Sequence, residues 1–129
     1  MSGSPLYFLT ISELAGLIRE KQVSPVEVTE AILSRIEALD GRYSSYATVM
    51  ADHAMDSAQR AENEIAAGRY LGPLHGVPVA VKDLCFTRGV PTMGYTPVLS
   101  GHIPDFDATV ISKLASAGAV LLGKLNLTE

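Results

Sequence analysis

Several residue types are scarce in this 129-residue chain, and each scarcity argues against a class of protein. Cysteine occurs once, at Cys85, so neither an internal disulfide nor a cysteine-rich metal site is expected. Tryptophan is absent and aromatic residues make up 6%, which argues against a surface that stacks nucleic-acid bases. No run approaches the roughly 20 apolar residues that a membrane helix needs. We therefore expect no metal, no membrane partner and a reducing compartment, the cytoplasm.

An excess of basic charge is also missing. Lys and Arg total 10 against 14 for Asp and Glu, which gives a formal net charge of −4. Binding to a phosphate backbone needs a basic face, so we expect no nucleic-acid partner. Hydrophobic residues make up 47% and charged residues 19%, which is typical of one packed globular domain.

Residues 1–70 predict an amino-terminal helical segment. Thr10 and Glu13 have the spacing of a capping box, and the sequence Ser24-Pro25-Val26-Glu27 is a stronger helix start. Apolar residues recur at helical spacing after each start. Asp40-Gly41 predicts the end of the second helix.

A short strand and a third helix complete this segment. Residues 46–50 predict a short strand, and residues 52–67 form an alanine-rich amphipathic pattern that ends near Gly68. We interpret these elements as a scaffold.

Residues 71–129 have a different character, which indicates an α/β core. Two continuous apolar runs, 77–81 and 119–122, predict strands buried on both faces, as in a parallel or mixed sheet covered by helices. A long connection over 84–106 and a helix capped by Asp107 separate them, so the segment predicts a βαβ unit.

Each of these strands is followed by a lysine, Lys82 and Lys124, at the sheet edge where α/β proteins bind ligands. We expect Lys82 to lie at the boundary of the apolar core. Desolvation disfavours a charged lysine, and a neutral lysine can act as a base. Asp83 should point to the opposite face. The alternative is a lysine that snorkels or forms an ion pair at a strand end.

Two other motifs give weaker indications of a functional site. The spacing Gly118-x-x-x-x-Gly123-Lys124 resembles a phosphate-binding loop, but Leu125 stands where a metal-binding hydroxyl is needed. Cys85 with His75 or His102 could form a nucleophile pair, although nothing in the spacing brings them together.

Four ordered motifs carry a resemblance to a known family. They are Gly72-Pro-Leu-His-Gly-Val-Pro-Val-Ala-Val-Lys82-Asp83, Gly89-Val-Pro-Thr92, Pro104-Asp-Phe-Asp-Ala-Thr-Val110 and Ala117-Gly-Ala-Val-Leu-Leu-Gly-Lys-Leu-Asn-Leu-Thr-Glu129. Together they closely resemble the amidase signature family. The resemblance implies an α/β fold with a mixed central sheet flanked by helices, of which residues 71–129 are the start of the catalytic core.

The resemblance also implies a reaction and a set of site residues. It makes Lys82 the catalytic base of a Ser-cisSer-Lys triad that hydrolyses a small-molecule carboxamide through a serine acyl-enzyme, with no cofactor. It places a substrate-binding stretch at Thr92, Met93, Gly94 and Tyr95. It gives supporting roles to Asp83, Lys124 and Asn126.

The two serines of the family lie well downstream of its Asn-x-x-Glu motif, beyond Glu129. We therefore expect this chain to be an amino-terminal piece, inactive alone and completed by the remainder of the same polypeptide or by a second chain. A homodimer is an alternative that the sequence does not decide. One alternative is the amidase subunit of a tRNA-dependent amidotransferase. Asn126-Leu127-Thr128-Glu129, where that subunit usually has Asn-Met-Asp-Glu, favours a stand-alone amidase. Another is a non-catalytic interaction module.

Overall fold

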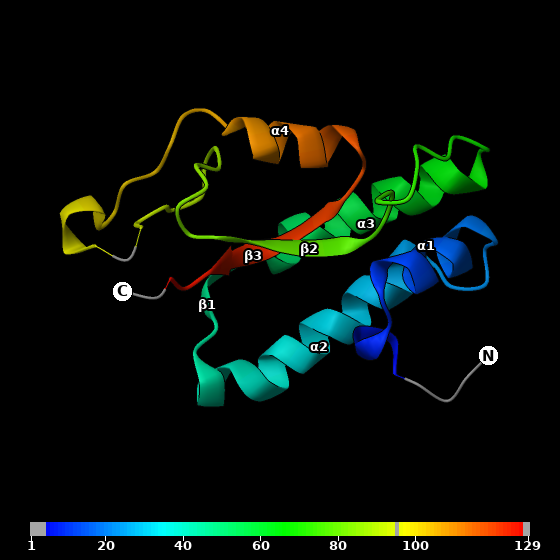
Figure 1. The fold of residues 1–129 in the computed structure, drawn as a ribbon, viewed down its shortest axis with the longest axis horizontal. Coiled ribbons are helices and arrows are strands. Elements are labelled where there is room, and N and C mark those ends of the chain that lie inside the picture. Colours follow the sequence, from blue (N-terminus) through cyan, green and yellow to red (C-terminus); the bar gives the residue numbers. More distant parts are fainter. Residues whose placement is uncertain (1–4, 95, 128–129) are drawn as a thin grey trace.

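The computed structural model describes residues 5–94 and 96–127 (Figure 1). Its four α-helices and three strands in these ranges are α1 (Ile11–Arg19), α2 (Pro25–Tyr43), β1 (Tyr46–Val49), α3 (Ala51–Ala66), β2 (Pro78–Lys82), α4 (Thr109–Ser116) and β3 (Val120–Leu125). Two short 3₁₀ helices, η1 (Leu6–Phe8) and η2 (Pro97–Leu99), lie in the connections. Within the same ranges no helix is both long enough and apolar enough to cross a membrane.

The predicted starts of the first two helices are confirmed. The Thr10 and Ser24 side chains each accept a hydrogen bond from the amide three residues later, and the glutamate there bonds back. The predicted end of α2 is wrong, because the helix continues through Gly41 to Tyr43. The Asp40 carboxylate instead accepts from two amides beyond the helix, including that of Ser45 at 2.8 Å, and so organises the turn into β1.

The predicted mixed α/β architecture is confirmed. The strand order is β1-β3-β2, with β1 antiparallel and β2 parallel to the central strand β3. In Figure 1, α4 lies above the sheet and α2 below it. The alanines Ala54 and Ala58 of α3 pack against Val120 and Leu122 of β3, where small side chains let the helix approach the sheet closely.

Two expectations about the βαβ unit need correction. Strand β2 is half-buried along most of its length, whereas β3 is buried from Val120 to Lys124. The difference arises because β2 lies at an edge of the described sheet and β3 at its centre. Asp107 does not cap α4: Ala108 is the N-cap, and the Asp107 carboxylate accepts from the Arg88 amide at 2.7 Å. Asp107 thereby joins the two ends of the long connection.

A buried histidine fixes the turn that leads into β2. His75 is fully buried, its Nδ1 accepts from the Leu71 amide at 3.0 Å, and its Nε2 lies 3.0 Å from a carboxylate oxygen of Glu64 in α3. Gly118, at φ +82°, lies against the imidazole, where a Cβ would collide with the ring. This packing ties α3 to the starts of both parallel strands.

Candidate active site

The two lysines at the carboxyl ends of β2 and β3 occupy opposite environments. Lys82 pairs in register with Leu125, and Lys124 pairs with the preceding residue, Val81. Successive strand positions point to opposite faces, so the lysines are directed to different sides of the sheet. Lys82 is exposed, whereas Lys124 has no exposed surface.

The expectation that Lys82 lies at a low-dielectric boundary is not met within the described residues. The side chain is exposed because it ends the edge strand β2. Its Nζ donates to the backbone carbonyl of Asn126 at 3.3 Å. Lys82 is therefore a solvent-accessible amine held at the sheet edge by one polar contact to the chain after β3.

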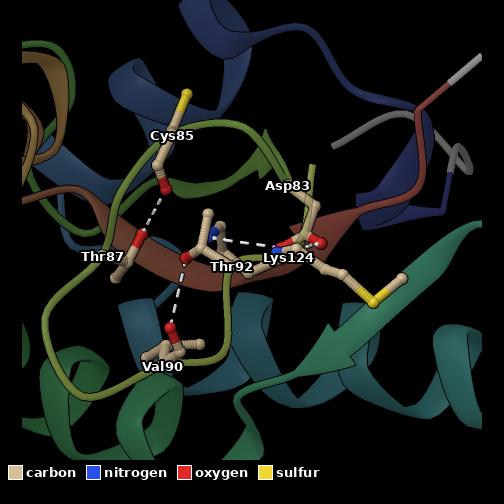
Figure 2. A network of polar contacts seen from close by, with 7 residues as sticks. Asp83, Cys85, Thr87, Val90, Thr92 and Lys124 are labelled. Carbon is tan, nitrogen blue, oxygen red and sulfur yellow. Dashed lines mark hydrogen bonds and ion pairs between the residues drawn. The ribbon is translucent and has the colours of Figure 1, made fainter. Parts of the chain in front are cut away.

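Lys124 is the amine that this fold buries. Its Nζ donates to Thr92 Oγ1 at 2.7 Å and lies 3.5 Å from Asp83 Oδ1 (Figure 2). Burial lowers the pKa of Lys124 below its ordinary value of 10.5, and the nearby Asp83 carboxylate offsets part of this effect. The low-dielectric surroundings that were expected for Lys82 are thus found at Lys124. Its ammonium, however, is already engaged by Thr92 and Asp83.

Asp83 connects this buried lysine to the loop after β2. Its amide donates to the Leu125 carbonyl at 2.8 Å, which extends the pairing of the two parallel strands by one step. Its Oδ2 accepts from the Met93 amide at 3.0 Å, and its carbonyl accepts from the Gly94 amide at 2.9 Å. As expected, the carboxylate is directed away from Lys82; its charged partner is Lys124.

The stretch predicted to bind substrate divides into buried and partly exposed residues. Thr92 is 1% exposed, and its hydroxyl donates to the Val90 carbonyl at 3.2 Å while accepting from Lys124. Met93 and Gly94 are partly exposed. Tyr95 lies outside the described residues. The Thr92 side chain is thus an internal anchor, and the two residues after it form the accessible part of the stretch.

Asn126, whose carbonyl accepts from Lys82, is itself held by two further hydrogen bonds. Its side-chain nitrogen donates to the Ser44 carbonyl at 2.7 Å, and its amide donates to the Ser45 carbonyl at 2.9 Å. These bonds fasten the carbonyl that receives Lys82 to the turn between α2 and β1. The turn conformation is unusual, with Ser44 at φ 52°.

Sequence reasoning missed the pairing of Asp83 with Lys124 and the anchoring of Thr92. An available signal was the charge order: an acidic residue directly after one predicted strand and a basic residue at the end of its parallel neighbour. Among the described side chains, the histidines have other partners than Cys85: His75 contacts Glu64, and His102 lies 5.3 Å from the Phe86 ring centre. No group of three potential metal ligands occurs in the same part of the chain.

Comparison with known proteins identifies the family. The Amidase family model matches residues 27–129, and the chain belongs to this family. AmiD of Mycobacterium tuberculosis, whose name places it among the amidases, is 49% identical over 94% of this chain and 26% of its own length. A glutamyl-tRNA(Gln) amidotransferase subunit of Moorella thermoacetica is 47% identical over 96% of this chain and 26% of its own length.

A solved structure shares the fold. The peptide amidase of Stenotrophomonas maltophilia superposes with a TM-score of 0.89 at 34% identity, covering 97% of this chain and 26% of that enzyme. The chain therefore spans about a quarter of the length of the relatives it matches.

Proposed function

We propose that the protein containing this chain is an amidase that hydrolyses a carboxamide through a serine acyl-enzyme, with Lys82 as the catalytic base. The observation that carries the proposal is the position of the Lys82 amine, exposed at the carboxyl end of β2 and oriented by the Asn126 carbonyl. An amine in this position is accessible to a hydroxyl group from another segment. Family membership and the match of Lys82 to the family's Val-Lys-Asp motif support this role.

The chemistry requires two serines beyond the described residues. Neutral Lys82 would accept the proton of a bridging cis-serine, which in turn takes the proton of the nucleophilic serine. The nucleophile attacks the amide carbon, the carbon–nitrogen bond breaks, and ammonia or an amine leaves after gaining a proton. Water then hydrolyses the ester. Backbone amides of a glycine-rich segment would stabilise the oxyanion, and no cofactor enters these steps.

The open edge of β2 is where this machinery would be completed. An ammonium cannot accept a proton, so Lys82 must be shielded from bulk water in the working enzyme. We propose that the remainder of the polypeptide, or a second chain, covers this edge and supplies both serines. Asn126 would then hold the amine in position, while Met93 and Gly94 line the approach of the substrate.

Replacing the proposed base tests the function. In the complete polypeptide that contains these residues, Lys82→Met should lower the turnover of a chromogenic amide by about 10²–10⁴-fold, the usual contribution of a general base. Lys113→Met is the matched control, because Lys113 is an exposed lysine of α4. Turnover in Lys82→Met equal to that of the control would refute the role of Lys82.

A second function has specific support, since the amidotransferase subunit is nearly as similar as AmiD. In that case the chain belongs to the amidase subunit of an assembly that releases ammonia from an amide for transfer to an acyl-tRNA. The purified polypeptide would then hydrolyse amides only with its partner subunits present. Full hydrolysis by the isolated polypeptide favours the stand-alone amidase.

A further inference from the structure

The 92–94 segment lies outside every helix and strand, yet three of its polar groups are bound to Lys124 of β3 and to Asp83, the residue that directly follows β2. Thr92 Oγ1 accepts from Lys124, the Met93 amide donates to the Asp83 carboxylate, and the Gly94 amide donates to the Asp83 carbonyl. A fourth bond, from the Thr92 amide to the His102 carbonyl at 3.0 Å, leads to the other arm of the same connection. The attachment of this segment to the sheet therefore passes through Asp83 and Lys124.

Burial makes this attachment sensitive to the position of the segment. The Lys124 side chain has no exposed surface in this arrangement, so its ammonium depends on protein partners in place of water. Asp83 Oδ1 has no hydrogen-bond donor in the described structure and meets the ammonium at the longer distance of 3.5 Å. Thr92 Oγ1, at 2.7 Å, is the closer of the two contacts. A displacement of the segment would leave a buried ammonium with the longer contact alone.

We propose that Lys124 is a positioning residue that sets where the 92–94 segment stands relative to Lys82, and so controls substrate binding. The inference rests on the proposed amidase function and assigns Lys124 and Thr92 to binding geometry, with no part in proton transfer. Thr92 acts from inside the fold, and Met93 and Gly94 present the surface that it positions.

The two lysines should separate kinetically. The backbone around Lys82 is held by strand pairing to Leu125 and by the Cys85 amide, which donates to the Lys82 carbonyl at 3.0 Å. None of these bonds involves the side chain of Lys124. Loss of Lys124 should therefore loosen the 92–94 segment while the base stays in place, which raises KM and leaves kcat nearly unchanged.

The experiment compares Lys124→Met, Thr92→Val and Thr92→Ser in the complete polypeptide, assayed with one chromogenic amide. We expect KM to rise about tenfold in the first two variants with kcat changed by less than about twofold, because the lost hydrogen bond holds the proposed substrate-binding segment and makes no contact with Lys82. Thr92→Ser keeps the oxygen that accepts from Lys124 and should restore the wild-type KM. A fall in kcat at constant KM, or a Thr92→Ser variant no better than Thr92→Val, overturns the proposal.

A second measurement needs no turnover. Hydrogen exchange of the Met93 and Gly94 amides should accelerate in Lys124→Met and Thr92→Val, and the amide of Asp83, which is bonded within the sheet, should not change. If Lys124→Met fails to fold, Thr92→Val decides the question by both measurements. Unchanged exchange at Met93 and Gly94 contradicts the inference even where Lys82→Met abolishes activity, and faster exchange with active Lys82→Met refutes the proposed function alone.

Discussion

Strands β2 and β3 look alike in sequence but differ in their place in the sheet, in burial and in the surroundings of their lysines. Both are short apolar runs with a lysine near the carboxyl end, and they pair in parallel at five positions. Strand β3 lies between two neighbours, and Lys124 is buried there with an acidic partner. Strand β2 lies at the edge, and Lys82 is exposed. The place of a strand in the sheet, more than its local motif, decides whether its lysine is structural or accessible to a reactant.

Asp83 shows how the different surroundings of Lys82 and Lys124 are maintained. Asp83 adjoins Lys82 in the chain, but alternation along the strand directs its carboxylate to Lys124. A buried ammonium needs such a partner, whereas an amine that is to accept a proton is better without one. Of these two adjacent residues, Lys82 supplies the exposed amine and Asp83 supplies the charged partner of the buried Lys124.

Removing Asp83 gives the largest expected break in this comparison. In Asp83→Ala the Lys124 ammonium loses its charged partner and the Met93 amide loses its acceptor. We expect a loss of about 3–5 kcal/mol in the free energy of unfolding, the usual cost of breaking one side of a buried ion pair. Lys82→Met should change stability by less than about 0.5 kcal/mol, as at other exposed positions. Urea denaturation of both variants measures the difference, and equal effects would contradict the contrast between the strands.

A smaller effect tests the packing of the central strand. A Cβ at Gly123 would collide with the Thr48 carbonyl oxygen and press on the Tyr46 ring, both in β1. We expect Gly123→Ala to destabilise the fold by about 1–3 kcal/mol through overpacking.

The matched control lies opposite on the edge strand. Ala80 pairs in register with Gly123, and Ala80→Gly should cost no more than about 1 kcal/mol, which is the backbone entropy of glycine. Thermal unfolding of the two variants measures which of them loses more stability. A larger loss for Ala80→Gly would mean that the edge strand is the more tightly packed of the two.

Local sequence signals predicted the elements and most of their boundaries. The capping boxes at Thr10 and Ser24 lie at the starts of α1 and α2, and the apolar runs before Lys82 and Lys124 are the two parallel strands. These features depend on residues a few positions apart, so the sequence contains the whole interaction. The family motifs added the mixed sheet and the residues that gather at its edge.

Apart from the end of α2, the failures concern groups whose partners are distant in the chain. Asp107 is a residue type that often caps helices, but its carboxylate accepts a hydrogen bond from the Arg88 amide and none from the start of α4. The apolar content of residues 77–81 indicated full burial, yet burial depends on which strand takes the central place. The contact of Lys124 with Thr92 joins residues 32 positions apart, and no local pattern carries it.

The smallest effect that we predict concerns pH and separates the two lysines without altering the packing. Because burial lowers the pKa of Lys124 in the folded state, the unfolded chain binds more protons between that lowered pKa and 10.5. Stability should therefore rise with pH across this window, and the rise should vanish in Lys124→Met. Burial raises the pKa of Tyr46 above 10.0, which acts in the opposite direction at the upper end of the window.

Subtracting the pH profile of Lys124→Met from that of the wild type cancels the contribution of Tyr46. The Asp83 carboxylate offsets part of the burial cost, so the remaining slope should be modest but positive. Urea denaturation at a series of alkaline pH values measures it, with Lys82→Met as the matched lysine variant. A difference profile that falls with rising pH would mean that attraction to Asp83 outweighs desolvation at Lys124, and that the central strand holds its charge more easily than its burial implies.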